Sequence, residues 1–193
     1  MRIVGGEFRG RALIAPGGRD TRPTSDRARE AIFNVIAHAS FGTQIEGARV
    51  IDLFAGSGAL GFEALSRGAG QALFVETDEQ ARGAIRDNAE ALGLFGRARV
   101  HRRSATDLGP RPGPIGDAFD LAFLDPPYGR SLGAPALVAL RDGLWLKPGA
   151  LVVLEEGRDD PLTEVPGFEP LDVRSWGAAR VSFMSRTGDD SAP

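Results

Sequence analysis

The sequence contains no cysteine and only two histidines. The absence of cysteine excludes disulfides, thiolate metal sites and a cysteine nucleophile, and two scattered histidines argue against a zinc site. No uninterrupted apolar run is long enough for a transmembrane helix, and the first residues lack the apolar core of a signal peptide. We therefore expect a cytoplasmic protein that binds neither a metal nor a membrane.

Lysine is nearly absent as well, since Lys147 is the only one and the other cationic side chains are arginines. The net charge of −3 argues against a protein coated in basic surface. The first thirty residues nevertheless carry seven arginines against four acidic residues, so we expect residues 1–45 to form a basic arm and helix that face nucleic acid. The candidate substrate contacts there are Arg9, Arg11 and Arg27. An ordinary solvated face, or an arginine bias set by genomic base composition, is the simpler alternative.

The chain has the length and the pattern of a single α/β domain. Its 193 residues suffice for one sizeable core. Strand patterns alternate with helical patterns, which indicates a parallel sheet. Gly177 then joins two further strands as a hairpin. The predicted strands are 49–54, 72–76, 98–102, 119–124, 150–155, 171–176 and 180–184; helices are expected at 26–39, 59–67, 79–92 and 136–146, the domain at 46–186, and a disordered tail at 187–193.

A glycine-rich loop follows the first of these strands. Gly56-x-Gly58-x-x-Gly61 matches the dinucleotide fingerprint, and Glu76 lies twenty residues after Gly56, where it could bind ribose hydroxyls. Asp52 argues for another ligand, because a carboxylate on the preceding strand would repel a pyrophosphate and attract an ammonium group. A cofactor with adenosine at one end and an amino acid at the other, S-adenosylmethionine, fits better. The alternative is tight strand–helix packing without a ligand.

A second loop, Asp125-Pro126-Pro127-Tyr128, directly follows the strand pattern at 119–124. Two prolines fix φ and offer no backbone N–H, so this loop can accept hydrogen bonds and stack but donates little. These groups suit a planar base with an exocyclic amine. The carboxylate and a carbonyl would accept hydrogen bonds from the amine, and the tyrosine ring would stack on the face of the base. Both loops follow carboxyl ends of strands and should open onto one crevice. A turn that merely ends the strand is the competing interpretation.

Taken together, these motifs resemble the RsmD-like 16S rRNA guanine-N2 methyltransferases. The resemblance spans nearly the whole chain and is most specific in the N-terminal strings Arg2-Ile3-Val4-Gly5-Gly6 and Thr21-Arg22-Pro23-Thr24-Ser25-Asp26-Arg27. It implies a class I, Rossmann-like methyltransferase fold with a mostly parallel seven-stranded sheet, an antiparallel last strand and a small N-terminal arm or hairpin. It also implies S-adenosylmethionine as the cofactor and a guanine of small-subunit rRNA, within an assembling ribosomal subunit, as the substrate. We expect a monomer.

The resemblance also assigns site residues. Asp125, Pro126 and Tyr128 would be catalytic, and Pro127 and Tyr128 would contact the base. Where the family usually has Asp-Ala after the third strand, this chain has Ser104-Ala105, so a hydroxyl or the backbone must bind the adenine. Trp176-Gly177 likewise replaces the usual Tyr-Gly. The predicted cofactor contacts are Asp52, Phe54, Gly56, Gly58, Glu76, Thr77, Ser104, Ala105, Arg22 and Thr24.

Other functions share parts of this pattern. A DNA amino-methyltransferase acting on adenine N6 or cytosine N4 would use the same loop, but only about 45 residues remain outside the sheet to read duplex sequence. A non-catalytic RNA-binding assembly factor could retain the fold, although the presence of Asp52 and Asp125 argues against it. A protein-amide or small-molecule methyltransferase would leave the N-terminal arginines without a role. Glu155 and Glu156 are interpreted as a solvated acidic pair.

Overall fold

The computed structural model describes residues 1–16 and 26–188. Its helices are α1 (Asp26–His38), α2 (Ala59–Ser66), α3 (Glu79–Ala91) and α4 (Gly133–Asp142), with a short 3-10 helix, η1 (Gly113–Ile115). Its strands are β1 (Arg49–Leu53), β2 (Gln71–Val75), β3 (Ala98–His101), β4 (Phe119–Leu124), β5 (Leu146–Gly157), β6 (Phe168–Trp176) and β7 (Ala179–Arg186). None of these helices is long and apolar enough to cross a membrane.

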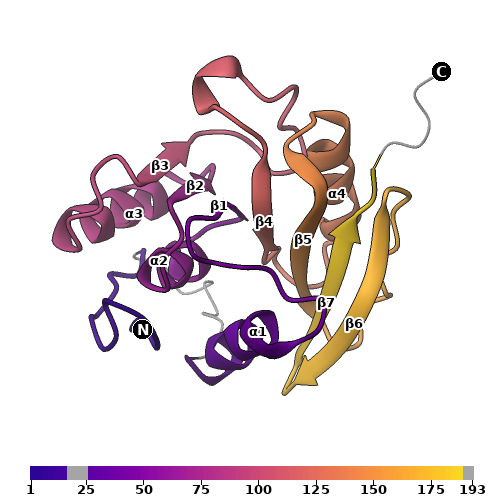
Figure 1. The fold of residues 1–193 in the computed structure, drawn as a ribbon, viewed down its shortest axis with the longest axis horizontal. Coiled ribbons are helices and arrows are strands. Elements are labelled where there is room, and N and C mark those ends of the chain that lie inside the picture. Colours follow the sequence, from indigo (N-terminus) through magenta and orange to yellow (C-terminus); the bar gives the residue numbers. More distant parts are fainter. Residues whose placement is uncertain (17–25, 189–193) are drawn as a thin grey trace.

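The seven strands form one sheet in the order β3-β2-β1-β4-β5-β7-β6 (Figure 1). Strand β4 lies at the centre and pairs in parallel with β1 and β5, and β1 pairs in parallel with β2. Strand β7 runs antiparallel to both of its neighbours, β5 and β6. The predicted fold class, a mostly parallel sheet of seven strands with an antiparallel last strand, is confirmed.

Helices cover both faces of the sheet, which explains why its central strands are apolar on both sides. On one face, Ile32 and Phe33 of α1 join residues of α2, α3 and the N-terminal arm in one hydrophobic core, into which Phe123 of β4 also packs. On the other face, Leu137 of α4 packs with Leu124 of β4 in a second core. Neighbouring residues of β4 therefore belong to opposite cores, and only the ends of the strands are left to carry polar groups.

The N-terminal arm pairs with itself and packs on α2. Arg2 and Ala12 form an antiparallel bridge, and Ile3 and Leu13 are buried in the first core. The backbone N–H of Phe8 donates to Ser66 Oγ at 2.9 Å. The described part of the arm therefore shares the core of the sheet.

The predicted bounds of α4 and of the last three strands differ from the structure: β5 ends at Gly157 and not at 155, β6 begins at Phe168 and not at 171, and β7 spans Ala179–Arg186 and not 180–184. The helix expected at 136–146 lies at Gly133–Asp142, and β5 begins at Leu146 instead of residue 150. The apolar pattern of the helix continues through Trp145, but this side chain leaves the helix and packs beside Phe119, with ring centroids 6.3 Å apart. Its indole N–H donates to the Gly109 carbonyl at 2.8 Å, so tertiary contacts override the local pattern.

Candidate active site

The glycine loop at the end of β1 wraps around the carboxyl group of Asp52. This side chain is 2 % exposed and accepts a hydrogen bond from the Gly61 N–H at 2.9 Å. The chain reaches this position through left-handed conformations at Phe54 (φ +58°), Gly56 (φ +54°) and Gly58 (φ +79°). A Cβ added at Gly58 would lie 2.8 Å from the Phe62 ring. Glycine is therefore required at 58 both by the backbone angle and by the space.

Burial raises the pKa of Asp52 to about 8, and the negative charge of Glu76 adds to the rise, whereas the hydrogen bond from Gly61 opposes it. Near neutral pH, this carboxyl group is therefore largely protonated as long as no cation is near it. An ammonium group placed beside it would favour the ionised form and lower its pKa.

Glu76, at the end of β2, ties the glycine loop to the start of α3. Its Oε2 accepts the Gly56 N–H at 2.9 Å, and its Oε1 accepts the N–H groups of Thr77 at 2.7 Å and Asp78 at 2.9 Å. A carboxylate has about four lone-pair sites, so it can also accept from hydroxyl groups. Asp52, the glycine loop and Glu76 thus lie at adjoining strand ends, as the sequence predicts.

The remaining predicted cofactor residues differ in what surrounds them. Ala105 is buried in the second core, and the hydroxyl groups of Ser104 and Thr106 are 2.9 Å apart in the turn after β3. Arg22 and Thr24 lie outside the described residues.

The Asp125-Pro126-Pro127-Tyr128 loop lies next to the glycine loop, because β4 pairs with β1 along its length. The register aligns Leu53 with Leu124, and the Asp125 N–H faces the Leu53 carbonyl at 3.5 Å. Pro126 is buried, whereas Pro127 and Tyr128 are exposed. The Tyr128 hydroxyl donates to Glu155 Oε1 at 2.6 Å. The structure thus brings the two predicted loops together.

Glu155 and Glu156 are not a solvated pair, and that interpretation is wrong. Both belong to β5, where they are 5 % and 6 % exposed. Glu156 forms an ion pair with Arg180 at 3.4 Å and accepts from the Thr163 hydroxyl at 2.6 Å. The cause is the length of β5, which runs past both residues and pairs with β7, so that Glu156 lies opposite Arg180. The sequence feature that could have indicated this burial is Arg180 in the last hairpin, since a buried glutamate needs a cationic partner.

The arginines of the N-terminal region that lie within residues 1–16 and 26–45 include two classes. Arg9, Arg11 and Arg27, the predicted substrate contacts, are all exposed, and Arg11 donates to the Ala91 carbonyl at 2.8 Å. Arg29 is fully buried and forms ion pairs with Asp26 and Glu63. The basic excess of this region is therefore partly structural.

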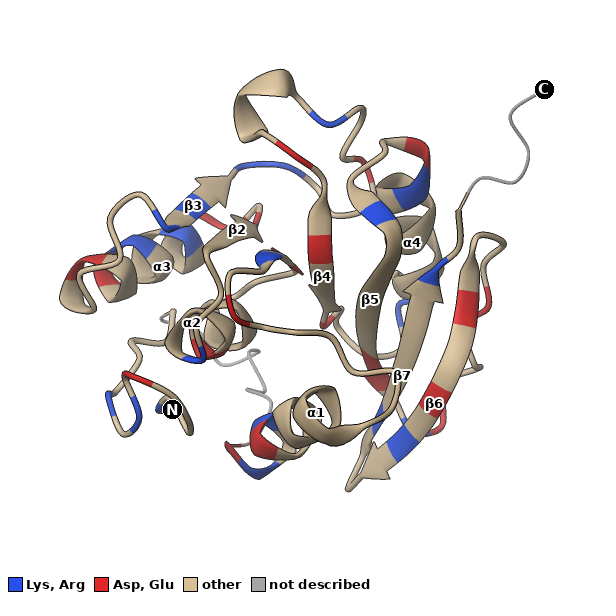
Figure 2. Cartoon of the chain, viewed as in Figure 1, with Lys and Arg blue, Asp and Glu red and all other residues tan. Residues whose placement is uncertain are grey.

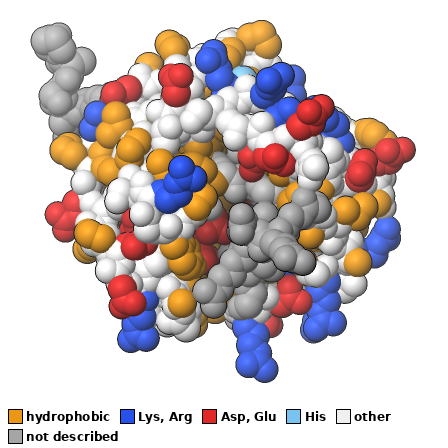
Figure 3. Space-filling view, turned by 180° about the vertical axis from the view of Figure 1, so that it is seen from behind, with side chains coloured by type: hydrophobic (Ala, Val, Ile, Leu, Met, Phe, Trp, Pro, Cys, Tyr) orange, Lys and Arg blue, Asp and Glu red, His pale blue; other side chains and the backbone are white. Residues whose placement is uncertain are grey.

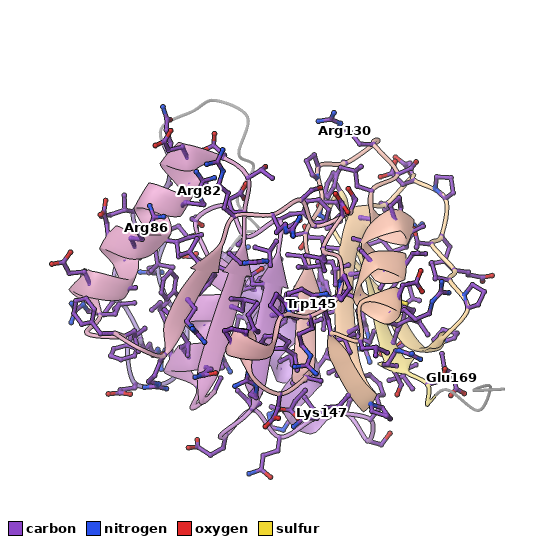
Figure 4. All side chains as sticks on the ribbon, turned by 90° about the horizontal axis from the view of Figure 1, so that it is seen from above. Arg82, Arg86, Arg130, Trp145, Lys147 and Glu169 are labelled. Carbon is purple, nitrogen blue, oxygen red and sulfur yellow. The ribbon has the colours of Figure 1, made fainter. Side chains whose placement is uncertain are left out.

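Further exposed arginines lie outside the N-terminal region. Figure 2 shows basic residues (blue) on α3 and β3 and in the connection that follows β3, which contains Arg102 and Arg103. Arg130, two residues after Tyr128, projects outward at the end of the molecule opposite Lys147 (Figure 4). On the face seen in Figure 3, basic groups gather near one edge with acidic groups beside them. The basic surface is thus mixed rather than continuous.

Sequence reasoning also missed Asn88. It is 2 % exposed in α3 and holds the N-terminal arm, because its amide accepts from the Ile14 N–H at 2.7 Å and donates to the Ile14 carbonyl at 3.0 Å. It also donates to the Ser57 carbonyl in the glycine loop at 3.3 Å. The sequence places Asn88 on the apolar face of α3, where a buried polar side chain needs hydrogen-bond partners, and this could have indicated its role.

Comparison with known proteins agrees with this arrangement. The family model described as "Conserved hypothetical protein 95" matches residues 1–185. The chain belongs to this family. The sheet is that of the Rossmann-like methyltransferases among solved structures, and the relatives from Bacillus subtilis and Haemophilus influenzae confirm the resemblance to RsmD-like methyltransferases that the motifs indicated.

Known relatives cover almost the whole chain. The "Putative rRNA methyltransferase YlbH" of Bacillus subtilis is 37% identical over 97% of this chain and 100% of its own length. The "Ribosomal RNA small subunit methyltransferase D" of Haemophilus influenzae is 37% identical over 92% of this chain and 89% of its own. Among solved structures, the "Putative methyltransferase yhhF" from Escherichia coli has a TM-score of 0.80 at 32% identity, covering 97% and 98% of the two chains.

Proposed function

We propose that this protein transfers a methyl group from S-adenosylmethionine to the exocyclic N2 amine of a guanine in 16S rRNA. The observation that carries the proposal is the adjacency of the two loops: the end of β4, which begins the Asp125–Tyr128 loop, pairs with the end of β1, which begins the glycine loop. A methyl donor held by one loop would therefore meet an amine held by the other. The names of the relatives from Bacillus subtilis and Haemophilus influenzae support rRNA as the substrate.

The residues at the ends of β1 and β2 fit the cofactor. Asp52 would bind the amino group, because a buried carboxyl group with a raised pKa gains most from a neighbouring cation. Among the described residues, the backbone at Gly56 lies in open space, since a Cβ added there would meet only the Phe54 carbonyl oxygen, at 3.9 Å. Within residues 1–16 and 26–188, Glu76 Oε2 accepts only the Gly56 N–H and so retains a lone pair for a ribose hydroxyl. Bound there, the cofactor supplies an electrophilic methyl group. Ser104 or the backbone beside it would meet the adenine, and Arg22 and Thr24 would close over the methionine end.

The Asp125–Tyr128 loop would prepare the amine for attack. An exocyclic guanine amine is a poor nucleophile, because its lone pair is delocalised into the ring. Asp125 and the Pro126 carbonyl would accept hydrogen bonds from its two N–H groups, direct the lone pair toward the methyl group and stabilise the positive charge that develops on nitrogen. Asp125 would then take the released proton. Tyr128 would stack on the base, which is worth about 1 to 3 kcal/mol.

The RNA would be held through its backbone by exposed arginines. Arg9, Arg11 and Arg27 are candidates for phosphate contacts, because a guanidinium group can bind a phosphate through two hydrogen bonds. Few residues remain outside the sheet to read a sequence, so we propose that the substrate is a preformed surface of an assembling small subunit. The protein would act there as a monomer in the cytoplasm.

The test is transfer of a labelled methyl group from S-adenosylmethionine to unmodified small-subunit particles, naked 16S rRNA and duplex DNA, followed by nucleoside analysis. We expect N2-methylguanosine in particles or rRNA, and none with Asp125→Ala. Label in adenine or cytosine of DNA would make the chain a DNA amino-methyltransferase. Cofactor binding or RNA binding without transfer to any acceptor would favour a non-catalytic assembly factor.

A further inference from the structure

Two side chains from the end of β5 and the connection after it hold the Asp125–Tyr128 loop and Gly129. The Tyr128 hydroxyl donates to Glu155 Oε1 at 2.6 Å, and the Gly129 N–H donates to Asp160 Oδ2 at 3.2 Å. The loop contributes few hydrogen-bond donors of its own, because two of its four residues are prolines. Contacts from outside the loop must therefore fix its position.

The carboxylate of Asp160 joins the loop to the sheet. The same oxygen that accepts the Gly129 N–H also accepts the Gly157 N–H, at 3.0 Å, where β5 ends. A Cβ added at Gly157 would lie 2.7 Å from this oxygen, so glycine at 157 leaves the space that the carboxylate occupies. Hydrogen bonds to an ionised acceptor are stronger than neutral ones. One side chain thus bridges the end of β5 and the catalytic loop.

Arg180 of β7 fixes the segment that carries Asp160. Its guanidinium group donates to the Asp160 carbonyl at 2.7 Å and to the Pro161 carbonyl at 2.8 Å. The same group forms the ion pair with Glu156, the residue opposite it in the sheet register. Asp160 is therefore held by the sheet itself, although it lies in a connection between strands.

A cavity of about 220 Å³ lies where this connection faces the loop. Tyr128, Gly129, Glu156 and Asp160 are among the residues that line it. If the hydrogen bond between Asp160 and Gly129 is lost, the loop has room to move toward this space. The bond therefore restrains a displacement that packing alone does not prevent.

We propose that Asp160 is a positioning residue for methyl transfer. By holding the Gly129 N–H, it sets the position of the Tyr128 ring and the Asp125 carboxylate relative to the methyl donor, and Glu155 is the second restraint on the same loop. The proposal rests on the proposed function, since loop position affects the reaction only if this loop holds the target base. A displacement of about 1 Å in a catalytic group can cost on the order of a hundredfold in rate.

The first test compares three variants in the methyl-transfer assay. Asp160→Ala removes the acceptor, Asp160→Asn keeps a carbonyl oxygen that can accept both N–H groups, and Asp159→Ala removes the neighbouring exposed carboxylate as a control of equal charge. We expect Asp160→Ala to lower kcat about 10-fold to 100-fold with an unchanged Kd for S-adenosylmethionine. Asp160→Asn should restore most of the rate, and Asp159→Ala should match the wild type.

The second test needs no substrate and measures amide hydrogen exchange in the peptide that contains Gly129. Exchange should be faster in Asp160→Ala and unchanged in Asp159→Ala. Gly157→Ala should also speed it, because the added methyl group displaces the Asp160 carboxylate without changing any charge.

The two tests separate this proposal from the proposed function. Exchange that is faster in Asp160→Ala and Gly157→Ala would support the restraint on the loop. If the wild-type protein at the same time methylates no RNA, the proposed reaction is rejected while the restraint stands. Wild-type kcat and wild-type exchange in Asp160→Ala would overturn the positioning role. An equal loss of kcat and cofactor affinity would also overturn it, because the damage would then extend beyond the loop. Should Asp160→Ala fail to fold, Gly157→Ala and Asp160→Asn decide the question by the same two measurements.

Discussion

The two halves of the proposed site, a cofactor half (Asp52, residues 54–61 and Glu76) and a catalytic half (residues 125–128), are held together in different ways. In the cofactor half, Asp52 binds the N–H of Gly61 and Glu76 binds that of Gly56, over separations of 9 and 20 residues. In the catalytic half, Glu155 and Asp160 hold the loop across 27 and 31 residues. The cofactor half is thus built from one strand–helix–strand unit, whereas the catalytic half depends on how β5 pairs with β7.

This difference determines which properties a substitution in each half should change. A change in the glycine loop acts on contacts within a unit that packs in the first core, so cofactor binding and folding should change together. A change near the catalytic loop acts on contacts across the sheet, so the reaction rate should change while cofactor binding is preserved. Variants that separate these two effects therefore test the comparison.

The largest expected effect is that of Asp125→Ala. It removes the carboxylate proposed to orient the amine and take its proton, and general-base and electrostatic contributions together exceed about a thousandfold in rate. Methyl transfer should be lost while the calorimetric affinity for S-adenosylmethionine stays within about threefold of the wild type. Equal loss of both quantities would contradict the independence of the two halves.

In the cofactor half, the buried Asp52 should make the free energy of unfolding depend on pH. Burial raises the pKa of Asp52 to about 8 in the folded protein, whereas the ordinary carboxyl pKa is near 4. The contribution of Asp52 to the free energy of unfolding is therefore fully present below about pH 4 and is lost as the pH rises toward 8. Asp52→Asn keeps an oxygen for the Gly61 N–H and cannot ionise. The variant should therefore gain stability over the wild type between pH 4 and 8, by at most about 1.4 kcal/mol per pH unit. Urea denaturation without cofactor measures the free energy of unfolding of both proteins at each pH. If the two pH profiles run parallel, Asp52 does not titrate with a raised pKa and the prediction is wrong.

Tyr128 tests how strongly the catalytic half depends on Glu155. Tyr128→Ala removes the stacking surface and should lower kcat/KM for RNA about tenfold or more. Tyr128→Phe keeps the ring and loses the hydrogen bond to Glu155, so we expect a loss of about threefold. Glu155→Gln, which can still accept from the hydroxyl, is the matched partner. If Tyr128→Phe is as damaging as Tyr128→Ala, the hydroxyl and not the ring carries the function.

The same division explains what could be predicted from the sequence. The sheet and the cofactor half follow from patterns within short segments: apolar strands, the glycine loop and the offset from Gly56 to Glu76. The roles of Glu155 and Asp160 did not follow, because they depend on strand register and on Arg180 in a distant hairpin. The helix boundary near Trp145 failed for a similar reason, since its apolar side chain suits a helix face and the second core equally.

The smallest expected effect concerns RNA contacts at the edge of the catalytic half. Arg130 is exposed close to Tyr128, and no hydrogen bond or ion pair of its side chain occurs among residues 1–16 and 26–188. Arg130→Ala should raise KM for the RNA substrate about twofold to threefold and reduce the salt dependence of binding by about one unit, because one phosphate contact is lost. Lys147→Ala is the control of equal charge at the opposite end of the molecule (Figure 4). If both variants change KM equally, the effect comes from net charge, and the RNA does not approach the catalytic loop from the side of Arg130.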